Sequence, residues 1–327
     1  MNRQGSRFDR GSADLATKTQ ETSMFAKVLT ASTLCLFLPM AAIAADNEWG
    51  NVADALGKSG TEMPGGVYRV GLPRTDLHVT LDGVQIKPTL ALGSWLAFQG
   101  SGNATMVMGD LVLTEDEIEP VMKKLADGGI EITALHNHLL RAKPETFYMH
   151  VLGHGDPAKL AAALHDGLAL SKTPLGNATA PVSSQAPVAG SEQPAQLDLD
   201  TAMIDRVLGA KGKAVGGVYQ VGVPRAETIH DNGMAVPPAM GSAEAINFQP
   251  TGDGRAAITG DFVLTAKEVN PVLRALRENG IEVTAIHNHM LDDEPRLFFM
   301  HFWANDDAAK LAASLRKALD QANVARS

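Results

Sequence analysis

Residues 129–140 read Gly-Ile-Glu-Ile-Thr-Ala-Leu-His-Asn-His-Leu-Leu, and residues 280–291 read Gly-Ile-Glu-Val-Thr-Ala-Ile-His-Asn-His-Met-Leu. They belong to a longer match, in which Asp110–Leu140 aligns with Asp261–Leu291 without a gap and 17 of the 31 positions are identical. The match continues on both sides, because the Gly-Gly-Val-Tyr at 65–68 recurs at 216–219 and the Met-His at 149–150 recurs at 300–301. A match of this length indicates that one domain-sized unit occurs twice in the chain.

The duplication divides the 327 residues into four parts. We expect a leader at 1–44, a first repeat domain at 48–170 and a second repeat domain at 198–323. Residues 171–197 between them are rich in Ser, Pro, Ala and Gly, which is typical of a flexible linker. Two copies of one unit are expected to pack with pseudo-twofold symmetry, and a tethered pair without contact is the alternative.

Strands of the repeat are indicated by runs of apolar residues and by alternation of apolar and polar residues. We expect strands at 67–72, at 74–81 and at 105–113 of the first copy. A further strand over 130–140 is expected to form a hairpin with residues 147–152, because Pro144 lies in the loop between them. These segments predict a mainly antiparallel sheet.

Helices are indicated at three places in the same copy. An amphipathic segment covers 52–58, and Thr114 and Glu117 form a capping-box sequence before a helix that stops at the glycine pair 128–129. Pro120 lies inside that helix, which predicts a kink or a start at the proline. A last helix is expected from 157 to 169. The fold class is therefore α+β, with two homologous repeats that each pack a sheet with two or three helices.

Histidines gather on the predicted hairpin. Side chains two residues apart on a strand point to the same face, so His136 and His138 are expected to project together. With the turn centred on Pro144, His138 lies opposite His150, which brings three imidazoles together. The corresponding residues of the second copy are His287, His289 and His301.

A His-x-His pair with a third histidine on the adjacent strand fits a metal site with three imidazole ligands and one open position. Zinc and copper both bind imidazole, so we expect a divalent transition metal, zinc or copper, at one site in each repeat. The alternative is that the histidines are structural and hydrogen-bond to the backbone and to Asn137 or Asn288.

Other polar residues near the histidines, most of them present in both copies, are candidates for supporting a metal-bound histidine or for holding an anionic ligand. These candidates are Arg74, Asp76, His78, Asp110, Glu131 and His154 in the first repeat and Arg225, Glu227, His230, Asp261 and Glu282 in the second. No residue is assigned a catalytic role.

Composition limits the chemistry further. Ten histidines accompany a single cysteine, so metal ligands must be imidazole and carboxylate rather than thiolate. The 28 Lys and Arg against 37 Asp and Glu give a net charge of −9, which argues against nucleic-acid binding. No glycine-rich phosphate loop follows a strand, so no nucleotide cofactor is expected. The expected partner is a metal ion or a small anionic ligand, and the oligomeric state stays open.

The leader resembles a secretory signal peptide. Met24–Ala44 contains a basic residue, an apolar core at 28–43 and a small-x-small cleavage site, so we expect translation to start at Met24 and cleavage to follow Ala44. The core of about 16 residues is shorter than the ~20 that span a bilayer. Membrane contact is therefore expected only during export. Cys35 lies inside this segment without a lipoprotein sequence, so the mature protein is expected to be periplasmic or secreted without a lipid anchor.

Three segments occur in both copies: Gly-Asp-(Leu/Phe)-Val-Leu-Thr, the Gly-Ile-Glu stretch that ends in His-Asn-His, and Phe-(Tyr/Phe)-Met-His. In these segments the chain is similar to the LppY/LpqO family of exported bacterial proteins, and the resemblance covers nearly all of the expected mature chain. It implies a location in the bacterial envelope. The family is itself a domain of unknown function, so the resemblance assigns no activity to any residue.

Three functions fit these observations. The first is an exported metal-binding protein with a three-histidine site in each repeat, used for storage, delivery or catalysis. The second is a periplasmic metal-dependent hydrolase that uses metal-activated water. The third is a module that binds an envelope ligand without metal, with the histidine-bearing face as its pocket.

Overall fold

The structure is a computed structural model that describes residues 48–176 and 197–325. These residues belong to one compact unit. The expected signal peptide and residues 177–196 of the expected linker lie outside the described residues. Among the helices that the structure describes, none is both long enough and apolar enough to cross a membrane.

The first repeat is built on a six-stranded antiparallel sheet in the order β1-β2-β5-β6-β8-β7. In chain order its elements are α1 (Glu48–Leu56), β1 (Thr61–Met63), β2 (Val67–Pro73), β3 (Thr80–Leu81), β4 (Val84–Gln85), α2 (Pro88–Ala91), β5 (Gly93–Gln99), the 3-10 helix η1 (Gly102–Ala104), β6 (Thr105–Leu113), α3 (Glu115–Asp127), β7 (Glu131–His136), β8 (Phe147–Gly155) and α4 (Pro157–Leu168).

The second repeat has a sheet of the same size in the corresponding order, β15-β17-β14-β13-β10-β9. Its elements are α5 (Thr201–Leu208), β9 (Lys213–Val215), β10 (Val218–Pro224), β11 (His230–Asp231), β12 (Met234–Ala235), the 3-10 helix η2 (Pro238–Met240), β13 (Ala243–Gly252), β14 (Arg255–Thr265), α6 (Ala266–Glu278), β15 (Glu282–His287), β16 (Asp293–Glu294), β17 (Leu297–Asp307) and α7 (Ala308–Leu319). The prediction of two α+β repeats is confirmed.

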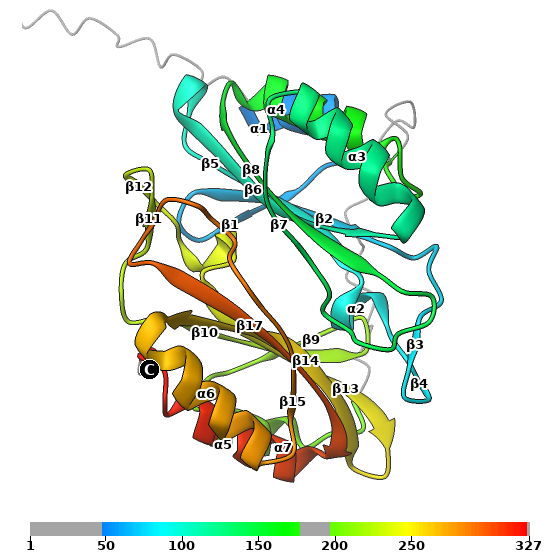
Figure 1. The fold of residues 1–327 in the computed structure, drawn as a ribbon, viewed down its shortest axis with the longest axis vertical. Helices are drawn as coiled ribbons and strands as arrows, with labels where there is room; N and C mark the ends of the chain where they lie inside the picture. The colour runs from blue at the N-terminus through cyan, green and yellow to red at the C-terminus, as the bar shows by residue number, and fades with distance from the viewer. Residues whose placement is uncertain (1–47, 177–196, 326–327) are drawn as a thin grey trace, which may run out of the picture. The chain divides into compact units, whose positions relative to one another are not determined.

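The longer helices of each repeat cover one face of its sheet, and the uncovered faces of the two sheets are turned toward each other (Figure 1). Strand β6 shows both environments. Leu111 packs with Leu125 of α3 in the core between sheet and helices. Met106 and Met108 point to the other face and pack with Phe299 of the second repeat. This second face is what the repeats bury against each other, so β6 is buried on both sides.

Equivalent hydrogen bonds connect the repeats in both directions. Arg69 Nη1 on β2 donates to the carbonyl of Ala239 over 2.5 Å, and Gln220 Nε2 on β10 donates to the carbonyl of Thr89 over 2.9 Å. Reciprocal contacts of this kind are what a two-fold relation between copies produces. The repeats therefore pack as a pair, and the tethered pair without contact is excluded.

Helix α3 shows how the predicted capping box works. The backbone N–H of Thr114 donates to Glu117 Oε2 over 3.0 Å, and the acidic residues of the first turn suit the positive end of the helix dipole. The helix begins at Glu115 and runs through Pro120, so it does not start at the proline. The corresponding bond in α6 joins Thr265 to Glu268 over 2.7 Å.

The strand predicted over 74–81 is wrong, because only Thr80–Leu81 is extended in a ladder. The cause is Arg74, whose side chain is fully buried. Its guanidinium donates to Asp76, to Glu117 and to the carbonyl of Val112. These bonds hold residues 74–76 at the end of the core. Arg74 and Asp76, two polar positions of the apparent alternation, therefore belong to an ion-pair cluster and not to a strand.

The strand predicted over 130–140 is also too long, since β7 ends at His136. A bulge at Thr133 separates the pair Ile132–Val151 from the pair Ala134–His150. A β-bulge adds one residue to a strand and changes which face the following side chains occupy. Ile132 therefore packs against the helix-side core, whereas the residues after the bulge turn toward the other repeat.

Candidate metal centre

Two strands of each sheet carry an acid and a histidine side by side at the inter-repeat face. Asp110 on β6 pairs with His150 on β8, and Asp261 on β14 pairs with His301 on β17. All four residues are buried. Because they sit on paired central strands, their backbones hold them at fixed positions, which suits a site that needs defined geometry.

The His-Asn-His segments enter from the end of β7 and of β15. His136 pairs with Tyr148, and His138 lies just beyond the strand with its ring stacked on Tyr148 at a centroid distance of 3.4 Å. In the second repeat His289 stacks on Phe299 at 3.4 Å. The aromatic ring thus fixes the plane of the second histidine of each segment.

The predicted register of the hairpin is wrong. His138 was expected opposite His150, but Ala134 occupies that position and His136 lies opposite Tyr148. The second copy has the same pairing, with Ala285 opposite His301. The pairs nearest the loop, Ala134–His150 and His136–Tyr148, place the centre of the turn at residue 142 rather than at Pro144, and the bulge lies beyond these pairs. The three histidines still converge because His138 folds back over Tyr148.

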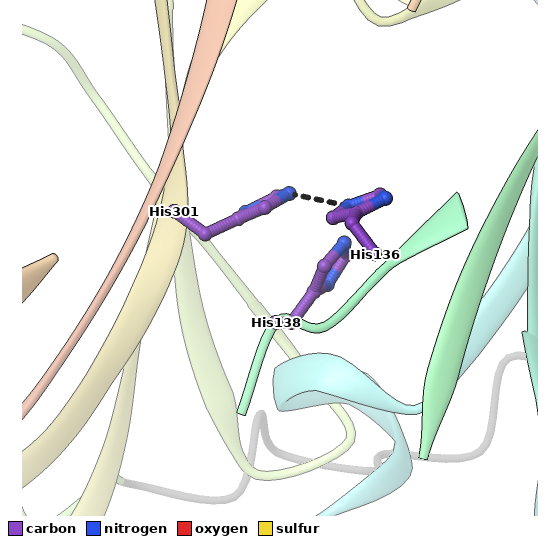
Figure 2. Close-up of side chains that lie close together, drawn as sticks. All are labelled: His136, His138 and His301. Carbon is purple, nitrogen blue, oxygen red and sulfur yellow. Dashed lines mark hydrogen bonds between the residues drawn. The ribbon is translucent and has the colours of Figure 1, made fainter. Parts of the chain in front are cut away.

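The six histidines form one cluster across the repeats rather than two separate triads. Ring centroids lie 3.7 Å apart for His136 and His287, 3.6 Å for His138 and His301, and 3.8 Å for His150 and His289. His136 Nε2 lies 3.2 Å from His301 Nε2. Figure 2 shows His136 and His138 reaching from the first repeat toward His301 of the second. This arrangement corrects the prediction of one three-histidine site per repeat.

Four groups of side chains have ligand atoms that all lie within 4.8 Å of one another. The three-histidine groups take residues from both repeats, and the groups within one repeat combine two histidines with an aspartate. The groups are His136, His138 and His301; His136, His150 and His287; Asp110, His138 and His150; and Asp261, His287 and His289. Asp110 and Asp261 are therefore potential metal ligands themselves and not only supporting residues.

Backbone groups orient the cluster. His301 Nδ1 lies 2.8 Å from the carbonyl of Gly260, so this nitrogen carries the proton and Nε2 presents its lone pair to the cluster. Across the repeats, Thr133 Oγ1 donates to the carbonyl of His289 over 2.7 Å, and Asn288 Nδ2 donates to the carbonyl of Thr133 over 2.9 Å. The bulge residue of the first repeat thus holds the His-Asn-His loop of the second.

Burial keeps the imidazoles neutral. Desolvation, followed by repulsion from neighbouring imidazoles, lowers the pKa of each of five histidines far below its usual value; these are His136, His138, His150, His287 and His289. Neutral imidazole is the form that binds metal ions, so the cluster does not have to lose protons from these rings before it can coordinate an ion.

The two aspartates are affected in the opposite direction. Burial raises the pKa of Asp261 to about 6 and raises the pKa of Asp110 well above its usual range, and the charge of Asp261 adds to the shift at Asp110. His289 Nε2 lies 3.2 Å from Asp261 Oδ2, and His138 Nε2 lies 3.6 Å from Asp110 Oδ2. A divalent cation would reverse this electrostatic penalty, because it would attract both carboxylates.

Many donor atoms of the cluster lack a partner. Within the described residues, seven buried atoms of these eight side chains have no hydrogen-bond partner: Asp110 Oδ1, His136 Nδ1, His138 Nε2, His150 Nε2, Asp261 Oδ1, His287 Nδ1 and His289 Nδ1. A buried polar atom left unsatisfied costs about 1–3 kcal/mol. So many in one place make the cluster a candidate site for a bound ion or ordered water.

The pKa shifts predict a pH dependence for the metal-free protein. The five histidines take up protons only in the unfolded state as the pH falls below about 6.5, so their contribution to stability is present above that pH and is lost below it. The raised pKa values of four carboxyls, Asp110, Asp231, Glu244 and Asp261, act in the opposite direction. Because five groups oppose four, we expect the free energy of unfolding to fall by roughly 1–2 kcal/mol per pH unit below pH 6.

Urea unfolding of the chelated protein between pH 7.5 and 5 measures this dependence. A free energy of unfolding that stays constant or rises toward pH 5 would contradict the assigned neutrality of the histidines.

Most of the other predicted residues lie elsewhere. Arg74 forms ion pairs with Asp76 and Glu117. Arg225 forms the corresponding ion pairs with Glu227 and Glu268, over 2.9 and 3.0 Å. The prediction that these arginines hold an anionic ligand is therefore corrected, because their N–H groups already have buried carboxylate partners.

The remaining candidates are spread over the surface and the edges of the site. Glu282 forms an ion pair with Arg141 of the first repeat over 2.8 Å, and Glu131 is exposed. His154 is an exposed residue near the end of β8, and His78 lies in the irregular segment before β3. His230 is on β11, opposite Glu294 of β16. The structure does not bring these residues into the histidine cluster.

A cavity of about 570 Å³ borders the cluster between the two sheets. His138, His150, His289 and His301 line it together with Asp110 and Asp261. Two further lining residues, Arg69 and Trp95, were not predicted as site residues. Arg69 is a charged residue inside the apolar strand predicted over 67–72, and this unusual position could have indicated it. No signal indicated Trp95, because no strand was predicted around it.

Both repeats match one protein family, described as Domain of Unknown Function (DUF1259), over residues 50–170 and 202–321. The chain belongs to this family. The two DUF1259 matches coincide with the internal duplication. The family description does not carry the LppY/LpqO name, so that resemblance stays a prediction.

Comparison with curated proteins gives no match. Two solved structures align with the DUF1259 chain. A trimeric bacterial microcompartment shell protein, PduB, is 12% identical over 82% of this chain and 96% of that chain, with a TM-score of 0.20. EtuB from Clostridium kluyveri is 8% identical over 80% of this chain and 91% of that chain, with a TM-score of 0.18. Scores this low carry no argument about fold or function.

Proposed function

We propose that the chain is a metal-binding protein whose metal centre is shared by its two repeats. The observation that carries this proposal is the group of seven unpartnered metal-donor atoms on five of the six histidines and on both aspartates. A packed core of these side chains without an ion leaves their lone pairs unsatisfied and their carboxyls facing each other. One or two divalent cations would satisfy both at once.

The donor set favours zinc or copper. Imidazole nitrogen with carboxylate oxygen and no thiolate suits both metals, and His-rich sets are less suited to calcium or magnesium, which prefer oxygen. The cross-repeat group His136, His138, His301 shares no residue with the group Asp261, His287, His289, so an ion held by both repeats leaves ligands for a second ion. We therefore propose a capacity of up to two ions per chain.

The proposed location is the periplasm or the exterior of a bacterial cell. It rests on the signal-peptide pattern at Met24–Ala44 and on the resemblance to the LppY/LpqO family. An exported protein meets metal ions outside the cytoplasm, where storage, delivery and catalysis are all compatible with the centre. Binding of a non-metal envelope ligand is the alternative if the purified protein holds no metal.

A metal-dependent hydrolase is a second candidate function, and the cavity favours it. Four of the histidines line the cavity, so a molecule there can reach an ion bound to them. Glu244 also lines it and is fully buried, and burial raises the pKa of its carboxyl well above the usual range. A metal-bound water would supply the nucleophile, and a protonated Glu244 could donate a proton to a leaving group.

Elemental analysis of the full chain, produced without a His tag and dialysed against buffer after zinc or copper loading, tests the proposed function. We expect one to two equivalents of metal per chain. The matched control is His154→Ala with His165→Ala, which removes two histidines outside the cluster and should leave the metal content unchanged. Less than about a tenth of an equivalent in the wild-type chain would overturn the proposal and favour the non-metal alternative.

A further inference from the structure

Arg69 gives the inter-repeat cavity a cationic wall. It lies on β2, and its guanidinium carbon sits 4.0 Å from the centroid of the Trp95 ring. Within the described residues its one hydrogen bond runs from Nη1 to the carbonyl of Ala239. Arginine has five N–H donors in a planar fork, so Nε and Nη2 remain available toward the cavity.

We propose that this cavity binds a small oxyanion, a carboxylate or a phosphate group, with Arg69 as its anchor. The guanidinium fork matches the paired oxygens of either group, and a partly buried position strengthens such a bond because water competes less. Stacking on Trp95 holds the fork in one plane, which reduces the entropy lost when an anion binds.

The anchor lies next to the histidine cluster. A Cβ atom placed on Gly241 would lie 3.1 Å from the Trp95 ring and 3.8 Å from His289 Nδ1, so the aromatic wall and the cluster approach the same point. A molecule of a few heavy atoms can therefore contact Arg69 at one end and reach the proposed metal ion at the other. With ions bound, the carboxylates of Asp110 and Asp261 would be neutralised, which leaves Arg69 free to attract an anion.

The duplication shows that this wall is particular to the first repeat. Arg69 corresponds to Gln220 on β10, since both strands continue to a glycine that pairs with the next strand. Gly71 pairs with Trp95 and Gly222 pairs with Ala245, so alanine replaces the tryptophan. The histidines and aspartates are kept in both halves, whereas the cation and its aromatic support are not. The end of the cavity at Arg69 thus has a cation on an aromatic support, which the corresponding positions of the second repeat lack.

Gly71 and Gly222 keep the cavity open. A Cβ atom at either position would meet no other atom within 4 Å among the described residues, and both glycines line the cavity. A larger side chain at Gly71 would extend into the cavity from the same face of β2 as Arg69. This allows the cavity to be blocked separately from the metal centre.

The test is calorimetric titration of the untagged full chain, zinc-loaded and zinc-free, with inorganic phosphate and with succinate. We expect at least one of them to bind, and the comparison of the two decides between a phosphate and a carboxylate ligand. Arg69→Gln and Gly71→Leu should each weaken binding at least tenfold while metal content stays at the wild-type value. Arg255→Gln, which removes an exposed arginine of the second repeat, should change neither.

Three results would overturn the inference: neither probe binds the wild-type chain, both variants bind as tightly as wild type, or Arg69→Gln loses the probe and the metal together. The last result would assign Arg69 a structural role between the repeats. The inference shares its cavity with the proposed metal centre, but the failures are distinguishable. If a chain that holds no metal binds the probe through Arg69, only the proposed function is contradicted. If the chain binds metal but no probe, only this inference is contradicted.

Discussion

Replacing His136 and His138 with alanine is expected to remove at least half of the metal bound by the chain. The two histidines together belong to three of the four groups of adjacent ligand atoms, and only Asp261, His287 and His289 would remain intact. The measurement is elemental analysis of the untagged variant after the same loading and dialysis as the wild type. Circular dichroism confirms that the sheet structure is retained.

A single change in the other repeat separates a shared centre from two independent sites. His301 belongs to a group with His136 and His138 and lies 3.2 Å from His136. In a chain whose His287 and His289 are already alanine, we expect a further His301→Ala change to weaken metal binding. In independent sites this change would leave the first site untouched. Metal content equal to wild type in the His136→Ala, His138→Ala chain would contradict the account outright.

Removing the metal by chelation is expected to lower the melting temperature by about 10 °C. An ion that binds only the folded chain stabilises it by about 4 kcal/mol when its free concentration is 1,000 times Kd. For a protein of this size each kcal/mol corresponds to roughly 2–4 °C. The ion would add to the apolar contacts, the hydrogen bonds and the Arg141–Glu282 ion pair that already join the repeats.

Thermal unfolding followed by calorimetry, with and without a chelator, measures this effect. The control is a chain in which His136, His138, His287 and His289 are all alanine, where the chelator should shift the melting temperature by less than about 2 °C. A wild-type chain whose melting temperature does not respond to the chelator, although it contains metal, would show that the centre does not link the repeats.

The sequence predicts the repeat well because its signals are local. The strand at 105–113 and the capping box at Thr114 are found where they were expected, since alternation and capping depend on neighbouring residues. The hairpin register failed because the turn is centred on residue 142 and not on Pro144. The alternation expected along 130–140 failed because Thr133 is inserted into β7, where it contacts the other repeat. An expectation based on side chains alternating between the two faces of a strand does not allow for an inserted residue.

The composition of the site was predictable, but its assembly was not. All six histidines were selected because they recur at matching positions. Their union into one cluster depends on the packing of two sheet faces, which a pattern within one repeat cannot contain. Arg74 shows the opposite error, because a charge present in both copies looked functional and is instead a buried structural ion pair. The duplicated Arg74 and Arg225 are structural, whereas the unduplicated Arg69 points to ligand binding.

The central claim is that ligands from both repeats coordinate the same ion. Anomalous diffraction at the absorption edge of zinc, from crystals of the untagged zinc-loaded chain, locates that ion directly. We expect a peak at about 2.0–2.2 Å from histidine nitrogens or aspartate oxygens of the cluster, with residues of both repeats among its ligands. Zinc found only at surface sites, or bound in each repeat by that repeat's own residues alone, would contradict it.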